Sequence, residues 1–154
     1  MAKKKFGLGI LAMVLVLGFT VVGCGDNGGD DDGWKELFPD LSTSSPTQAA
    51  LDVAGLTLQE FNQIVSAGGG GYKGWELDEY LYIVWTGRSV SNFNSTANVL
   101  EDLFDGTERE EDNGVHTAYG DEYLLFFSSV VYKDEYVSYP ARLMYASLGE
   151  MDWD

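Results

Sequence analysis

Two segments of the sequence, residues 80–86 and residues 123–131, are apolar on both faces of an extended strand. The two faces of the first segment carry Tyr80, Tyr82 and Val84 on one side and Leu81, Ile83 and Trp85 on the other. Successive side chains of a strand point to opposite faces of a sheet, so a strand of this kind needs a covering layer on each face. We therefore expect these segments to be neighbouring central strands, with Trp85 and Phe126 in the core.

Three further segments have the residue composition of strands: residues 72–77, 115–119 and 141–148. Short turns join the first of these to residues 80–86 and the second to residues 123–131, which is typical of β-hairpins. The sequence thus predicts an antiparallel sheet of about five strands. The mostly acidic residues 105–113 are predicted to form a surface loop.

Cap and stop signals predict three helices. The first two helices lie within residues 45–55 and 57–68, and the second starts with a capping box of Thr57 and Glu60. We expect this pair to form an N-terminal helical hairpin. The third helix covers residues 91–104, and one apolar stripe predicts that it packs on the sheet.

The predicted order of elements is a helix pair, two strands, one helix and three strands, which defines an α+β fold. Four consecutive glycines, residues 68–71, connect the helix pair to the first strand as either a mobile hinge or a plain connector. This element order resembles that of profilin-like domains, including PAS and roadblock modules, over residues 45–149. The resemblance implies one five-stranded antiparallel sheet that carries helices, and a sensor or assembly role.

The charge of the chain excludes one class of partner. The 154 residues include 9 Lys and Arg against 25 Asp and Glu, a formal net charge of −16. Removal of residues 1–23, which contain three lysines and no acid, leaves six basic residues against 25 acidic ones, a net charge of −19. Such a surface repels a phosphate backbone, so we expect no nucleic-acid partner.

Residues 1–23 have the three parts of a secretory signal. Residues 3–5 are lysines, an apolar run follows over residues 6–22, and Gly23 is the small residue before the only cysteine, Cys24. The apolar run is short for a membrane span, which needs about 20 apolar residues. The pattern therefore favours a removable signal over an uncleaved membrane helix.

The stretch Val21-Val22-Gly23-Cys24 resembles the lipobox of bacterial lipoproteins, and the whole signal is most similar to those of spirochaete lipoproteins. The resemblance implies cleavage before Cys24 and a thioether-linked diacylglyceryl group on its sulfur, with a further acyl chain such as palmitate. The partner of Cys24 is then a membrane, and the protein is lipid-anchored in the cell envelope, outside the cytoplasm. Gly25 after the cysteine leaves the choice between inner and outer membrane open.

The rest of the chain divides into a tether and one domain. Residues 24–44 are predicted to be an acidic, Gly/Asp-rich tether, because residues 25–33 contain no apolar side chain to bury. A calcium loop does not fit, since its sixth position needs glycine and here holds Asp31. Trp34, Leu37 and Phe38 are able to dock on the domain, which we place at residues 45–154.

The best candidate for a ligand site is the start of the third helix. The Arg88 guanidinium can donate two hydrogen bonds to one anion. The free N–H groups near Ser89 and Ser91, at the helix start, also suit an anion. The alternative is that a serine caps the helix while Arg88 pairs with one of the many carboxylates.

His116 is the only histidine, so a Ser-His-Asp hydrolase would have to use it together with Ser89, Ser128 or Ser129. No serine lies in a Gly-x-Ser-x-Gly elbow, so a structural role is favoured for His116. With Arg88, Ser89 and Ser91, it is also a candidate ligand-binding residue. We expect no metal and no cofactor. The sequence favours a non-catalytic envelope protein that binds a small molecule or a protein. The alternatives are an envelope hydrolase that uses His116 and a passive surface lipoprotein.

Overall fold

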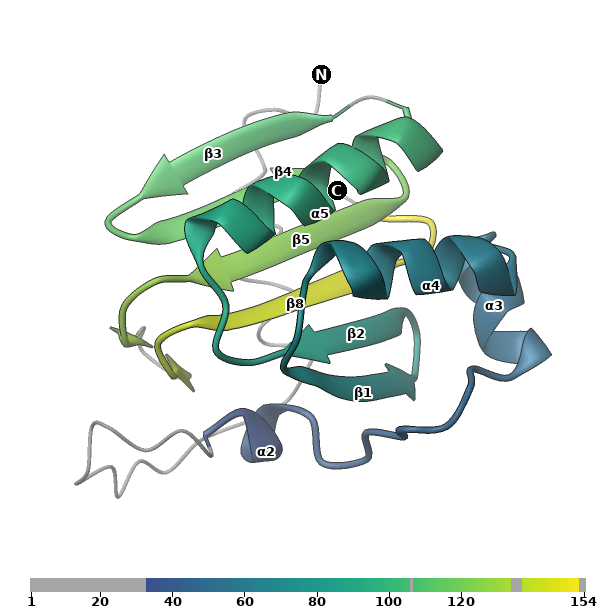
Figure 1. Cartoon of the computed structure of the whole chain (residues 1–154), viewed down its shortest axis with the longest axis horizontal. Coiled ribbons are helices and arrows are strands. Elements are labelled where there is room, and N and C mark those ends of the chain that lie inside the picture. The colour runs from purple at the N-terminus through teal and green to yellow at the C-terminus, as the bar shows by residue number, and fades with distance from the viewer. Residues whose placement is uncertain (1–32, 106, 134–136, 153–154) are drawn as a thin grey trace.

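The structure is a computed structural model, and it describes residues 33–105, 107–133 and 137–152. Its centre is a six-stranded antiparallel sheet with the strand order β1-β2-β8-β5-β4-β3 (Figure 1). The strands are β1 (Tyr72–Leu77), β2 (Leu81–Trp85), β3 (Glu108–Asp112), β4 (Val115–Tyr119), β5 (Tyr123–Ser128) and β8 (Leu143–Leu148). The predicted α+β class, with a helix packed on an antiparallel sheet, is therefore confirmed.

The sheet has one strand more than predicted, because residues 105–113 are not simply a loop. They contain β3, which pairs with β4 from Glu108↔Tyr119 to Asp112↔Val115. The turn between these strands is Asn113-Gly114, and both residues have positive φ, 53° and 84°. Asn-Gly is a strong hairpin signal. The acidic composition of β3, unusual for a strand, concealed this signal.

Strand β8 occupies an inner position that the sequence did not indicate. It pairs with β2 along one edge and with β5 along the other, for example through Ala146, which lies opposite both Ile83 and Leu125. Trp85 and Phe126 are both buried, as predicted. They are not on neighbouring strands, however, because β8 separates β2 from β5.

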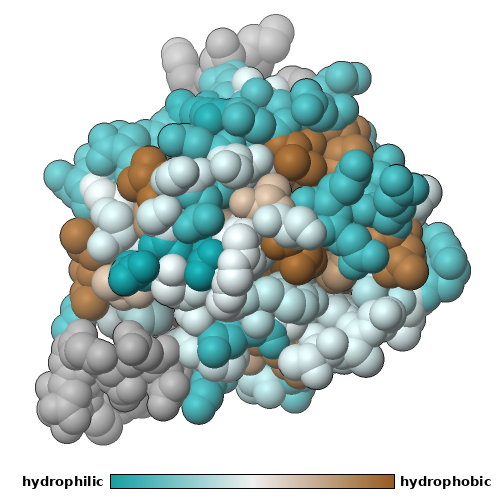
Figure 2. Space-filling model, viewed as in Figure 1, coloured by the Kyte–Doolittle hydropathy of each residue, from teal (hydrophilic) through white to brown (hydrophobic). Residues whose placement is uncertain are grey.

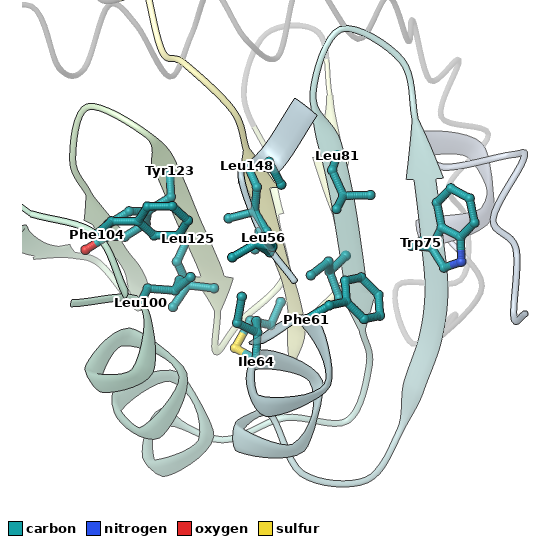
Figure 3. Packing of buried hydrophobic residues seen from close by; sticks show 14 of the residues in the cluster. Leu56, Phe61, Ile64, Trp75, Leu81, Leu100, Phe104, Tyr123, Leu125 and Leu148 are labelled. Carbon is teal, nitrogen blue, oxygen red and sulfur yellow. The ribbon is translucent and has the colours of Figure 1, made fainter. Parts of the chain in front are cut away.

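Three helices cover one face of the sheet: α3 (Gln48–Ala54), α4 (Leu58–Ala67) and α5 (Val90–Leu103). Helix α4 lies alongside α5, and α3 contacts β2 (Figure 1). Both predicted helices of the N-terminal pair exist, and the packing of α4 on α5 was not predicted. Side chains of α4 and α5 point toward the sheet (Figure 3). The core of this face includes Leu51, Leu56, Phe61, Ile64, Leu81, Trp85, Phe93, Leu100, Leu125 and Leu148.

The other face of the sheet is covered by a short helix and a small hairpin that the sequence did not predict as elements. Helix α2 (Trp34–Leu37) contributes Leu37 and is followed by Phe38, and both residues are buried. The hairpin consists of β6 (Tyr132–Lys133) and β7 (Ser138–Tyr139). These segments complete a second core with Tyr82, Val84, Phe126, Val137, Tyr139, Leu143 and Tyr145.

The tether predicted for residues 24–44 is therefore too long. Ser42 exchanges backbone hydrogen bonds with Trp75 of β1, at 2.7 and 2.9 Å, and Leu37 and Phe38 are part of the second core. The folded domain thus begins at or before Trp34 and not at residue 45. The signal, Cys24 and the rest of the tether lie outside the described residues.

Candidate functional site

The loop from β2 to α5 meets the glycine segment, residues 68–71, beside Arg88. The Arg88 side chain donates from Nε to the carbonyl of Thr86 at 3.0 Å and from Nη1 to the carbonyl of Gly68 at 2.6 Å. The Thr86 N–H donates to the carbonyl of Gly71 at 3.0 Å. Two features that the sequence suggested separately, Arg88 and the glycine segment, are thus brought together.

The glycines leave room for the guanidinium group. A Cβ atom added at Gly69 would lie 2.7 Å from Arg88 Nη1, and one added at Gly71 would lie 2.7 Å from Nη2. Both glycines also have positive φ, 79° and 80°, a conformation that L side chains avoid. Glycine is therefore favoured at both positions by backbone conformation, and at Gly71 also because an added Cβ would overlap the backbone carbonyl of Thr86.

A second arginine, which the sequence analysis missed, completes the arrangement. Arg142 precedes β8 and has a left-handed backbone, with φ of 68°. Its side chain donates from Nε to the carbonyl of Arg88 at 3.1 Å and from Nη2 to the carbonyl of Gly87 at 3.2 Å. The Arg88 N–H in turn donates to the Arg142 carbonyl at 3.1 Å. No sequence signal links residues 54 positions apart, since the contact depends on β8 lying beside β2.

The pKa of the Arg88 guanidinium reflects its surroundings. Partial burial lowers the pKa of the Arg88 guanidinium, and the positive charge of Arg142 lowers this pKa further. Within the described part of the chain, both side chains donate to backbone carbonyls and neither forms an ion pair. The predicted pairing of Arg88 with a carboxylate is therefore wrong. Arg109 behaves differently, because it pairs with Glu101 at 2.6 Å.

Ser89 and Ser91 do not join the guanidinium groups. Ser89 is the N-cap of α5: its Oγ accepts from the Asn92 N–H at 3.3 Å, and the Asn92 side chain accepts from the Ser89 N–H at 3.0 Å. Ser91 is exposed in the first turn of the helix. The helix start is thus capped by the chain itself, as the structural alternative predicted.

His116 lies on β4, where its ring packs against Phe93 of α5 and Phe127 of β5, with centroids 5.5 and 5.7 Å away. The three candidate serines have other roles. Ser89 caps α5, Ser128 donates to the carbonyl of Val130, and Ser129 donates to the carbonyl of Gly114. The surroundings of His116 are those of a residue packed between aromatic rings.

The described residues contain no group of three or more His, Cys, Asp or Glu side chains that could hold a metal ion. Within the same residues, every helix is too short or too polar to cross a membrane.

The sequence matches no protein-family model, and comparisons with curated proteins and with solved structures gave no match. The resemblances to lipoprotein signals and to profilin-like domains thus stay predictions.

Proposed function

We propose that this protein is a lipid-anchored protein of the cell envelope that acts by non-covalent binding. The observation that carries the proposal is the signal pattern of residues 1–23 directly before Cys24, together with a folded domain that begins at or before Trp34. Residues 25–33 alone then separate the lipid from the domain. Nine residues span at most about 30 Å, so the domain stays close to the membrane surface.

A binding role is favoured by the character of the exposed surface. On the face that carries α4 and α5, apolar surface is broken into separate patches by hydrophilic residues (Figure 2). The guanidinium groups of Arg88 and Arg142 are held in place by backbone carbonyls and offer charged donors. Fixed donors of this kind suit recognition of a polar ligand.

The hydrolase alternative is weakened by what His116 and the serines contact. The His116 ring packs against Phe93 and Phe127, and Ser128 and Ser129 donate to backbone carbonyls. An activity screen with esters and peptides would test the alternative. Hydrolysis by the wild type that disappears in His116→Ala, with an unchanged melting temperature, would favour the enzyme over the binding protein.

The anchor is tested by metabolic labelling with a fatty acid. We expect the wild type to be labelled and to fractionate with membranes, because the Cys24 thiolate is the lipid acceptor. The Cys24→Ala variant should carry no label and retain residues 1–23. Thr20→Ala, a change inside the apolar run, is the matched control and should be labelled like the wild type. Equal labelling of Cys24→Ala and the wild type would disprove the anchor.

A further inference from the structure

Arg88 and Arg142 are neighbours in a strongly acidic chain: the Arg88 N–H donates to the Arg142 carbonyl at 3.1 Å, and Arg142 Nε donates to the Arg88 carbonyl at 3.1 Å. The chain has 25 Asp and Glu against 9 Lys and Arg, so carboxylates that could pair with an arginine are abundant. Yet across the described ranges neither guanidinium forms an ion pair. Like charges at short range repel. The pair therefore carries positive charge that the described residues leave uncompensated.

The guanidinium groups are also held in fixed positions. Each has five N–H donors, and two of the five on each group bond to backbone carbonyls. The glycine segment lies against the Arg88 guanidinium, since a Cβ atom added at Gly69 or at Gly71 would lie 2.7 Å from one of its nitrogens. Because the groups are already ordered, a ligand that binds the remaining donors causes little further loss of conformational entropy.

We propose that Arg88 and Arg142 bind a single phosphate group as a dianion. Two guanidinium groups match a charge of about −2, which a phosphate monoester carries near pH 7. The planar guanidinium also fits phosphate oxygens with paired hydrogen bonds. A carboxylate carries one negative charge and would leave the other guanidinium uncompensated.

The acidic surface around the pair restricts the ligand. A net charge of −16 opposes a polyanion, so the site takes one phosphate and not a nucleic-acid backbone. The site attracts the phosphate at short range, through the side chains of Arg88 and Arg142. The phosphate belongs either to a soluble compound or to a lipid headgroup. This inference rests on the proposed binding role and extends it by naming the ligand class, and it does not depend on the lipid on Cys24.

The test uses the mature lipidated protein in neutral detergent, at constant pH and ionic strength. Inorganic phosphate is titrated by calorimetry, and the melting temperature is measured in parallel. We expect saturable binding and a melting temperature that rises by several degrees at ~100-fold excess over the dissociation constant. Sulfate, also a dianion, should act similarly, and acetate should have no effect.

Arg142→Gln is the decisive variant, because Arg142 is exposed and its loss leaves the Arg88 contacts to the glycine segment in place. We expect phosphate to bind at least about tenfold more weakly. Lys133→Gln is the matched control: it removes the positive charge of an exposed side chain in β6 and should bind phosphate like the wild type. Arg142→Lys keeps the charge but not the paired donors, so its affinity for phosphate should be intermediate. It replaces Arg142→Gln in the test if the glutamine variant does not fold.

Three results would overturn the proposal. The first is that phosphate neither binds to the wild type nor raises its melting temperature. The second is that Arg142→Gln and Lys133→Gln bind phosphate with the same affinity. The third is that acetate binds as strongly as phosphate.

A last measurement distinguishes a lipid headgroup from a soluble phosphate compound by adding phosphatidic acid to the detergent micelles. A rise in melting temperature as large as with inorganic phosphate would support a lipid headgroup, and no rise would support a soluble phosphate compound. Loss of labelling in the Cys24 experiment would leave these results intact.

Discussion

Gly68 lies against the indole ring of Trp85, and this contact leaves no space for a side chain. A methyl group added to Gly68 would overlap the ring, although the Gly68 backbone, with φ of −72°, is one that alanine adopts. The ring itself is fixed, because Trp85 is fully buried and its Nε1 donates to the carbonyl of Val65 at 3.3 Å. The side chain cannot move aside without disturbing the core.

We predict that Gly68→Ala lowers the free energy of unfolding by about 1–3 kcal/mol, the usual cost of overpacking. The measurement is chemical denaturation followed by tryptophan fluorescence. Gly70→Ala is the matched control, since an added methyl group there meets no atom of the described residues within 4 Å. It should change stability by less than about 0.5 kcal/mol. Equal effects of the two substitutions would contradict the packing of Trp85 on Gly68.

The same residues show what the sequence reveals at this scale. Alternation within residues 80–86 was enough to predict that Trp85 is buried and which face it shares with Leu81 and Ile83. The sequence marks Gly68 as a helix stop and as part of the glycine segment, but not as a contact of Trp85, because its need for space arises from a strand that follows later in the chain. The same holds for Arg142, whose proximity to Arg88 depends on strand pairing.

At the scale of elements, β8 is the strand on which the sheet depends most. It joins the β1–β2 hairpin to the three strands β5, β4 and β3, and all six of its residues are buried. A proline in an inner strand removes a ladder hydrogen bond and cannot be accommodated by either neighbour.

We predict that Ala146→Pro abolishes cooperative folding, because Ala146 pairs with Ile83 on one side and Leu125 on the other. Circular dichroism and a thermal melt would measure the loss. Glu111→Pro in the edge strand β3 is the matched control, since β3 pairs with β4 only. It should leave a folded protein of lower stability. A cooperative melt of Ala146→Pro near the wild-type temperature would show that β8 is not the link between the two parts.

Elements made from adjacent segments were the ones that sequence reasoning found. The bounds of β1 and β4, and the capping box of α4, are as predicted, because each is encoded by residues close together. The inner position of β8 and the packing of α4 on α5 were missed, since both depend on contacts between distant segments. The acidic β3 was missed for another reason, since its pairing with β4 outweighs its poor strand propensity.

At the scale of the whole molecule, buried and half-buried tyrosines link stability to alkaline pH. Burial raises the pKa of Tyr72 and of Tyr123 to about 12, and it also raises the pKa of Tyr82, Tyr119 and Tyr145. A tyrosine in the unfolded chain loses its proton near pH 10. Between about pH 10 and 12 the unfolded state therefore binds fewer protons than the folded state, and stability falls as pH rises.

We predict that the free energy of unfolding is nearly constant from pH 7 to 9 and falls steeply above about pH 10. Urea titrations at successive pH values would measure it. Tyr123→Phe removes one of the buried phenols and should reduce the steepness of the alkaline loss, whatever its effect at pH 7. An unchanged slope in Tyr123→Phe would show that this phenol ionises equally easily in both states.

The inner place of β8 also has a consequence for the order in which the chain is made. Every other strand of the six-stranded sheet precedes β8 in the sequence. Until residues 143–148 emerge, β2 and β5 each have an open edge, and both strands are buried on both faces in the finished domain. Open apolar edges invite wrong pairing, so a productive sheet forms late, after nearly all of the domain has been synthesised. Late closure would suit the export that we propose for this chain, in which a secretory signal takes the polypeptide across a membrane as an extended thread.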